Sequence, residues 1–259
     1  MYRPEHKKPF SKLILNRLRF SFLRRGLDSG PDLVDRAPAE RIAVLVPHPD
    51  DEVIGCGGTL YKHTQAGETV TTIYLTDGGK GNQWCLGPSP ELIRTRRLEA
   101  EEASRVLGIT NLVFLDYSDG GLAPSEPVVK GVFEALQAAR PQCIFLPFFL
   151  DDHPDHVATN LIFAALAPQL KGKMQVFAYE VWTPLPPNRI VDISAVVSVK
   201  EEAIHKHVSQ MNQVDYAGGI LGLNRYRSMS AASGHGFFEA FFAADIETYA
   251  KLVQKILRP

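Results

Sequence analysis

The stretch Ile42-Ala43-Val44-Leu45-Val46-Pro47-His48-Pro49-Asp50-Asp51-Glu52 joins an uninterrupted apolar run to a cluster of ionisable side chains. The run at 42–46 is short and rich in branched residues, which is typical of a strand buried inside a sheet. Open α/β sheets place their ligand sites beyond the carboxyl ends of their strands. The polar cluster is therefore expected at such a site.

A second apolar run, residues 143–150, ends in the same way, with Asp151-Asp152-His153-Pro154-Asp155-His156 directly after it. In a parallel sheet both runs end at the same edge, so the two clusters can meet. His48, Asp51 and His156 then form a set of two imidazoles and one carboxylate, which suits zinc with one position open. Zinc lowers the pKa of bound water to about 7 and polarises a carbonyl group. Asp50 remains as an unligated carboxylate beside the metal and a candidate general base.

The motif at 47–52, followed by Gly55-Cys56-Gly57-Gly58-Thr59-Leu60, resembles the hallmark of the LmbE/PIG-L family of zinc-dependent N-deacetylases. The element at 153–156 resembles the second motif of that family, and the resemblance runs from about residue 40 onward. It implies the following roles: metal ligands His48, Asp51 and His156, the base Asp50, His153 at the carbonyl oxygen as an imidazolium, and Asp155 orienting His153.

The resemblance also implies the reaction, which is removal of an N-acetyl group from an N-acetylglucosamine-type sugar conjugate. The residues alone support only metal-assisted hydrolysis of a polar substrate. Three further side chains are candidates for substrate binding. Arg96 would point into the pocket, with a surface pair to Glu99 as the alternative. Asp77 lies in a loop that flanks the pocket in the family, and Trp84 would stack on a sugar face or pack that loop down.

Two other functions remain open at this point. The glycines at 55–58 are compatible with a nucleotide-binding Rossmann-type enzyme, because glycine-rich turns between a strand and a helix can cradle phosphate. The charged run between the strand and the first glycine argues against that fingerprint. The other alternative is a sugar-binding relative without catalytic activity, although neither a predicted ligand nor the base is missing.

The remaining pattern predicts an α/β fold, Rossmann-like and three-layered, with a mainly parallel central sheet and the active site at the C-terminal strand edge. We expect strands at 42–46, 70–75, 111–116, 143–149, 174–179 and 237–242, with a short strand of a smaller element at 189–193. We expect helices at 57–66, 90–107, 128–139, 156–166, 199–211 and 246–256.

The chain has 259 residues, a formal net charge of −1 and three cysteines. A near-neutral chain does not indicate nucleic-acid binding, and an odd number of cysteines fits a reducing, cytoplasmic compartment. We expect residues 1–40 to form a basic segment and linker, and 41–259 the catalytic domain. Residues 10–25 have the pattern of a basic amphipathic helix, which is compatible with peripheral membrane contact and a lipid-linked substrate. Oligomerisation and a divalent ion other than zinc remain open.

Overall fold

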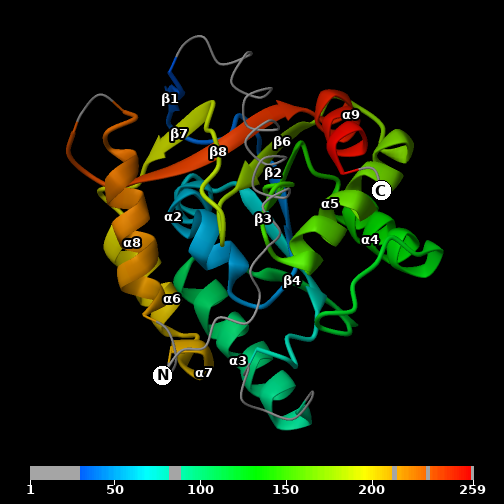
Figure 1. Ribbon diagram of the computed structural model, residues 1–259. Helices are drawn as coiled ribbons and strands as arrows, with labels where there is room; N and C mark the ends of the chain where they lie inside the picture. Colours follow the sequence, from blue (N-terminus) through cyan, green and yellow to red (C-terminus); the bar gives the residue numbers. More distant parts are fainter. Residues whose placement is uncertain (1–29, 82–88, 212–214, 232–233, 258–259) are drawn as a thin grey trace, which may run out of the picture.

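The computed structural model describes residues 30–81, 89–211, 215–231 and 234–257, and these fold around one sheet (Figure 1). The sheet contains eight strands in the order β1-β7-β8-β6-β5-β2-β3-β4. Only β8 runs antiparallel to its neighbours among these described strands. The strands are β1 (Asp32–Val34), β2 (Arg41–Val46), β3 (Thr69–Thr76), β4 (Asn111–Tyr117), β5 (Cys143–Pro147), β6 (Gln175–Tyr179), β7 (Arg189–Asp192) and β8 (Phe238–Asp245).

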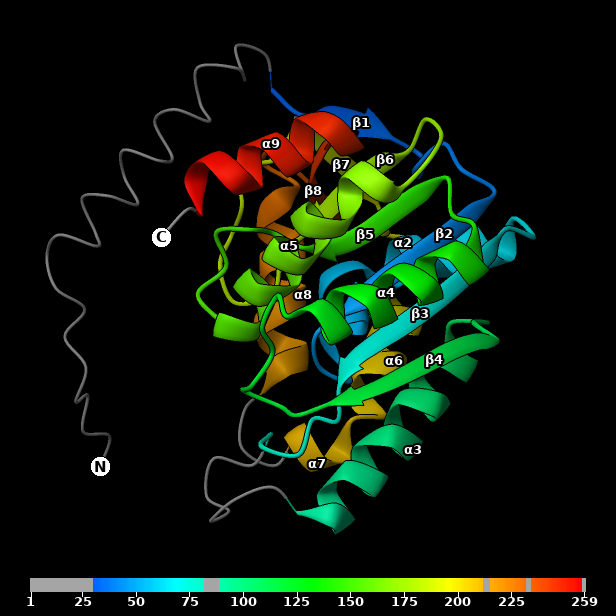
Figure 2. The ribbon, with the colours of Figure 1, turned by 90° about the vertical axis from the view of Figure 1, so that its right-hand side faces the viewer.

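Helices cover both faces of the sheet, as Figure 2 shows. One layer consists of α4 (Glu126–Ala139), α5 (Pro154–Leu166) with the short 3-10 helix η1 (Ala167–Gln169), and α9 (Ile246–Ile256). The other layer consists of α2 (Asp51–Gln65), α3 (Pro90–Val106), α6 (Val197–His205), α7 (Val208–Met211) and α8 (Tyr216–Arg227). The predicted three-layer α/β architecture with a mainly parallel sheet is therefore confirmed.

The alternation of side chains along β2 explains why this strand is apolar throughout. Ala43 and Leu45 belong to the core under α4, α5 and α9, whereas Ile42, Val44 and Val46 belong to the core under α2, α3 and α6. All five are at most 1% exposed. A strand that is buried on both faces cannot show the polar alternation of a half-exposed strand.

The order of the strands places a crevice between β2 and β5. From β2 the chain moves outward through β3 to β4, and then returns through α4 to β5 on the other side of β2. Strand order reverses at this point, and open α/β sheets bind ligands at such switch points, outside the carboxyl ends of the strands. The two His/Asp clusters follow β2 and β5, so both lie at the switch point.

Several expected boundaries were wrong. Helix α2 begins at Asp51 instead of residue 57 and has non-helical angles at Cys56 (φ −146°, ψ 16°), so the glycines lie inside a kinked helix. The expected helix at 199–211 is two helices, α6 and α7. Strand β7 belongs to the main sheet, paired with β1 and β8, instead of to a smaller element.

Two elements were not expected at all. Strand β1 lies within the residues that were expected to be linker, and it is too short for a periodic pattern. Helix α8 contains three glycines, which are poor helix formers, so its helical signal is weak. The basic segment at 10–25 lies outside the described residues. None of the described helices combines the length and the apolar character that a bilayer span requires.

Candidate metal centre and active site

The turn between β2 and α2 presents three ionisable side chains at the sheet edge. Asp50 precedes the first residue of α2 and has φ 141° and ψ −25°, a conformation that residues other than glycine rarely adopt. Such backbone strain concentrates at functional sites, because the surrounding structure must hold it in place. The strained turn lets Asp50 and Asp51 face the crevice from consecutive positions.

His48 and His156, two of the predicted ligands, both lie close to the carboxylate of the third, Asp51. Asp51 Oδ2 lies 3.2 Å from His48 Nδ1 and 3.2 Å from His156 Nε2. The backbone N–H of His48 also donates to Asp51 Oδ2 at 2.8 Å, which fixes the orientation of the carboxylate. His156 is fully buried, and neither of its ring nitrogens has a hydrogen-bond partner. An orphaned imidazole nitrogen beside a carboxylate fits a metal ligand, since buried polar atoms are otherwise almost always paired.

The nitrogen of each histidine that faces away from Asp51 meets another carboxylate. His48 Nε2 lies 3.1 Å from Asp155 Oδ2 and 3.4 Å from Asp119 Oδ1. His156 Nδ1 lies 3.3 Å from Asp151 Oδ1. Histidines that bind metals have such partners on their second nitrogen, which fixes the tautomer and the ring orientation. Burial alone would lower the pKa of His48, but the surrounding carboxylates outweigh it and hold the pKa well above its usual value.

Two groups of potential ligands that overlap with this set have all their donor atoms within 4.8 Å of one another, a criterion that the predicted set does not meet among the described residues. The first is His48, His153 and His156, and the second is His48, Asp119 and Asp155. The second group would use Asp119 and Asp155 themselves as ligands at His48 Nε2. An arrangement around Asp51 instead leaves these carboxylates as partners behind His48, which agrees with the usual build of a metal site.

Asp50 is held by Arg96 and stays free of the histidines. Arg96, from α3, is 2% exposed and donates to Asp50 Oδ2 at 3.1 Å, to Pro49 O at 2.8 Å and to Gly78 O at 2.9 Å. Burial raises the pKa of Asp50 to about 7, although the charge of Arg96 opposes the shift. Arg96 lines the pocket as predicted, and the alternative pair with Glu99 does not form.

His153 lines the pocket, but its predicted partner was wrong. The carboxylate of Asp155 faces His48, and it also accepts hydrogen bonds from Gly120 N at 2.7 Å and Leu122 N at 3.2 Å. Only the backbone N–H of Asp155 reaches His153, donating to Nδ1 at 3.2 Å. Burial lowers the pKa of His153, which disfavours the predicted imidazolium. With Nδ1 accepting, the neutral ring carries its hydrogen on Nε2.

Asp77 and Trp84 are the other two predicted substrate-binding residues. Asp77 Oδ1 accepts from Gly79 N at 2.9 Å and Asp119 N at 3.2 Å, so it braces its own loop and does not line the pocket. Loop carboxylates often bond the backbone two residues on, which is why sequence could not separate the two roles. Trp84 lies outside the described residues.

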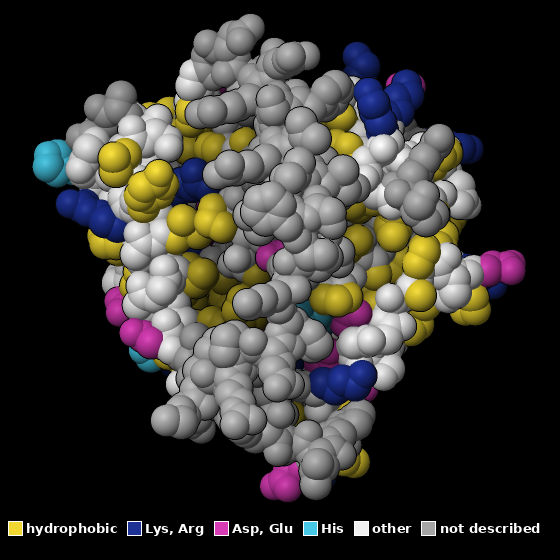
Figure 3. Space-filling model, viewed as in Figure 1, with side chains coloured by type: hydrophobic (Ala, Val, Ile, Leu, Met, Phe, Trp, Pro, Cys, Tyr) yellow, Lys and Arg dark blue, Asp and Glu magenta, His cyan; other side chains and the backbone are white. Residues whose placement is uncertain are grey.

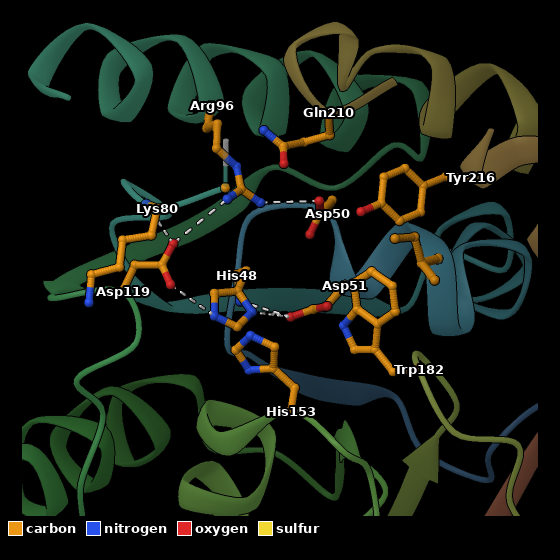
Figure 4. A pocket seen from close by; sticks show the side chains of 12 residues that line it. His48, Asp50, Asp51, Lys80, Arg96, Asp119, His153, Trp182, Gln210 and Tyr216 are labelled. Carbon is orange, nitrogen blue, oxygen red and sulfur yellow. Dashed lines mark hydrogen bonds and ion pairs between the residues drawn. The ribbon is translucent and has the colours of Figure 1, made fainter. Parts of the chain in front are cut away.

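Residues from distant elements complete a pocket of about 130 Å³ around this centre (Figure 4). In the close view Lys80 and Asp119 lie on one side of His48 and Asp50, while Trp182 and Tyr216 lie on the other. The remaining lining residues include Ile54, Gly81, Gln210 and those already described. Of these additional residues, Asp119 alone was expected to shape the pocket, from its polar turn at a strand end and the family resemblance, and the others were not among the predicted site residues.

The glycine-rich turn does not form a phosphate cradle. Gly58 N and Thr59 N donate to the two oxygens of the Glu239 carboxylate at 2.9 and 2.7 Å. Glu239 is fully buried and pairs with Lys200 at 2.7 Å. Because a protein carboxylate already occupies these N–H groups, the nucleotide-binding alternative lacks its anion site.

Comparisons with known proteins agree with this geometry. The model of a family described as "PIG-L: GlcNAc-PI de-N-acetylase" matches residues 43–167. A diacetylchitobiose deacetylase of Thermococcus kodakarensis is 29% identical over 187 residues, which cover 66% of this chain and 70% of that protein.

Two solved structures share the fold over most of their length. The N,N'-diacetylchitobiose deacetylase of Pyrococcus horikoshii, in complex with its inhibitor MPG, has a TM-score of 0.72 and 26% identity, covering 95% of this chain and 96% of that one. The conserved protein TT1542 of Thermus thermophilus has a TM-score of 0.65 and 30% identity, covering 78% of this chain and 93% of that one.

Proposed function

We propose, from the premise that the chain belongs to the PIG-L/LmbE family, that it is a metal-dependent hydrolase that removes the N-acetyl group from an N-acetylglucosamine-type sugar conjugate. One observation carries the proposal. His48 and His156 follow two neighbouring parallel strands and both bring a ring nitrogen to 3.2 Å from Asp51 Oδ2. Asp50 lies beside this set without belonging to it.

His48, Asp51 and His156 would hold the metal, and zinc is the ion that two imidazoles and one carboxylate suit best. The buried, unpaired Nε2 of His156 supports this fit. A divalent ion bound there would act as a Lewis acid on the amide carbonyl and increase the acidity of water. The carboxylates behind the two histidines would increase the basicity of the ligands.

Asp50 would act as the general base and then as the general acid. With a pKa of about 7, its carboxylate can accept a proton from the attacking water and return it to the leaving amine at neutral pH. The Arg96 hydrogen bond holds that carboxylate in one orientation. His153, on the other side of His48, would donate from Nε2 to the oxygen that gains charge in the transition state.

The polar side of the pocket would bind the sugar. Lys80 and Asp119 line this side, and the backbone N–H of Lys80 donates to Asp119 Oδ2 at 2.9 Å. An ammonium and a carboxylate together can donate to and accept from sugar hydroxyls. The relative from Thermococcus is named for diacetylchitobiose, and the family for GlcNAc-PI. Both names indicate N-acetylglucosamine units, which this chain would share as its substrate class.

Hydrolysis of simple N-acetylglucosamine derivatives tests the proposal. The purified protein, with its metal content measured, should release acetate and free amine in equal amounts. Asp50→Asn should keep the metal and lower kcat by roughly 10²–10⁴-fold, because it removes a base that is not a ligand. Asp116→Asn is a suitable control, since Asp116 is exposed and pairs with Arg97 outside the pocket. No release of acetate by the metal-loaded protein, or an Asp50→Asn variant of unchanged activity, would contradict the assignment.

A further inference from the structure

A second cavity opens beside the catalytic pocket and shares three of its walls. It has a volume of about 170 Å³, and Ile54, Trp182 and Tyr216 line both spaces. Val181, Asp215, Gly219 and Ile220 complete the lining. Figure 3 shows the corresponding hollow beside α8, with hydrophobic side chains gathered in it. The two spaces are therefore neighbours, and a ligand bound at the metal centre can reach the second one along Ile54, Trp182 and Tyr216.

The cavity is apolar. Trp182 and Tyr216 meet edge to face with ring centroids 5.9 Å apart, and Trp182 is 50% exposed. Among the described residues that line it, Asp215 alone is charged, and its carboxylate caps α8 by accepting from Gly218 N at 2.8 Å. An apolar hollow with aromatic side chains at its rim is typical of ligand-binding pockets. The cavity would therefore accept an uncharged, apolar group.

The geometry of an amide indicates which part of the substrate points there. The carbonyl carbon is planar, with the nitrogen on one side of the C=O bond and the first carbon of the acyl chain on the other. Lys80 and Asp119 lie on one side of the metal centre, and Trp182 and Tyr216 on the other (Figure 4). When the sugar hydroxyls contact the polar side, the acyl chain points to the aromatic side.

We infer that the cavity lined by Ile54, Val181, Trp182, Tyr216, Gly219 and Ile220, here called the acyl pocket, binds the acyl group of the substrate, and that this enzyme hydrolyses N-acyl sugars with acyl groups larger than acetyl. The inference rests on the proposed hydrolase activity. A dry cavity of about 150 Å³ accommodates benzene, so the acyl pocket can take a group as large as a phenyl ring or a short alkyl chain. In the reaction the oxygen of water bonds to the carbonyl carbon, the amide C–N bond breaks, and the nitrogen takes up a proton from the water, so the products are a carboxylate and the free amine.

The expected size of the effect follows from apolar burial. Each methylene that enters the pocket should raise kcat/KM about fourfold, which corresponds to about 0.8 kcal/mol per buried CH₂. N-butyryl and N-hexanoyl derivatives of one methyl glucosaminide should therefore exceed the N-acetyl derivative by successive steps. Chains that outgrow the pocket should gain nothing more. Hexanoate should inhibit the metal-loaded enzyme competitively at a lower concentration than acetate does. This inhibition is a second test of the acyl pocket.

Helix α8 offers a variant and a matched control. A Cβ at Gly219 or at Gly222 meets no atom within 4 Å, and both glycines are exposed on α8, but only Gly219 lines the acyl pocket. Gly219→Leu should fill the pocket and reduce the ratio of kcat/KM for hexanoyl over acetyl at least about tenfold, since it removes the burial of two or more methylenes. Gly222→Leu should leave that ratio unchanged.

The outcomes separate this inference from the proposed function. Failure to hydrolyse even the N-acetyl derivative would contradict the hydrolase assignment itself. Hydrolysis of the N-acetyl derivative without any gain from longer acyl groups would overturn the acyl pocket alone. In a parallel series the acyl group stays acetyl and the alkyl aglycone becomes longer. This series tests whether the cavity binds the aglycone instead. If Gly219→Leu changed only that series, the cavity would bind the aglycone, and the inference would be wrong.

Discussion

Lys200 Nζ donates a hydrogen bond of 2.7 Å to Glu239 Oε1, and neither side chain is exposed to solvent. Glu239 lies on β8, and its carboxylate also accepts from Gly58 N and Thr59 N, directly after the kink of α2 at Cys56. The pair therefore holds the second part of α2 against the sheet while the first turn carries the site. This buried charge pair links three elements that no local motif connects.

Lys200→Met should destabilise the protein by about 3–5 kcal/mol, because it leaves a buried carboxylate without its cation. Urea unfolding followed by circular dichroism measures the change. Lys206→Met is the matched control, since Lys206 pairs with Glu202 at 3.1 Å on the surface of the same region. Exposed pairs contribute about 0–1 kcal/mol. Equal losses of unfolding free energy in the two variants would show that the buried pair stabilises the protein no more than the exposed pair.

Asp151→Asn should weaken metal binding about 10–100-fold, the usual effect of removing a carboxylate behind a histidine ligand. Asp151 Oδ1 lies 3.3 Å from His156 Nδ1, and its Oδ2 accepts from Trp182 N at 2.9 Å. Competition against a metal-binding dye gives the affinity. Asp152→Asn changes an exposed neighbour and should have little effect. Unaltered zinc affinity in Asp151→Asn would remove His156 from the ligand set.

The sequence predicted the parts of the fold and site that depend on local pattern. Two apolar runs, each followed by a His/Asp cluster, predicted two buried parallel strands that end at one edge, and the structure has β2 and β5 as neighbours. His48 and His156 meet there for that reason, while their role as ligands stays a prediction. The closing helix at 246–256 was also recognisable, because its apolar face is strongly periodic.

Other parts of the site depend on tertiary packing and were not predictable. Trp182 and Tyr216 come from a loop after β6 and from the glycine-rich α8, and neither element carries a pattern that points to the crevice. The partner of Asp155 was wrong for a related reason. The family resemblance implied His153, but the start of α5 turns the carboxylate towards His48 on a different strand end.

His207 should contribute a loss of stability as pH decreases from 7 to 5. Burial, with the nearby charge of Arg96, lowers the pKa of His207 to about 3. The unfolded chain binds a proton there with a pKa of about 6.5, whereas the folded chain does not. This group therefore stabilises the fold fully above pH 6.5, and unfolding becomes easier by about 2 kcal/mol at pH 5.

Comparing urea unfolding at pH 7 and pH 5 isolates that contribution. Relative to wild type, His207→Leu should shift the difference in unfolding free energy between pH 7 and pH 5 by about 2 kcal/mol in favour of pH 5. His205→Leu, at an exposed position on α6, should not change that difference. Identical pH dependence in wild type and His207→Leu would mean that His207 titrates equally in both states.

Arg96→Met should raise the pKa of Asp50 further, because Arg96 is the strongest of the charges that oppose the effect of burial. A base with a higher pKa is protonated at neutral pH, so kcat/KM should fall at pH 7. The acidic limb of the pH–rate profile should move to higher pH, with each unit lowering kcat/KM about tenfold on that limb. Arg97→Met, at an exposed neighbour that packs on Phe114, should leave the profile unchanged.

The position of that limb distinguishes two roles for Arg96. If Arg96 positions the base, the limb shifts and activity returns at alkaline pH. If Arg96 instead binds the sugar, kcat/KM falls equally at every pH, because substrate binding is lost while the base is unchanged. The three hydrogen bonds from Arg96 to Gly78 O, Pro49 O and Asp50 Oδ2 favour the first result, since they occupy its guanidinium with the turn that carries the base.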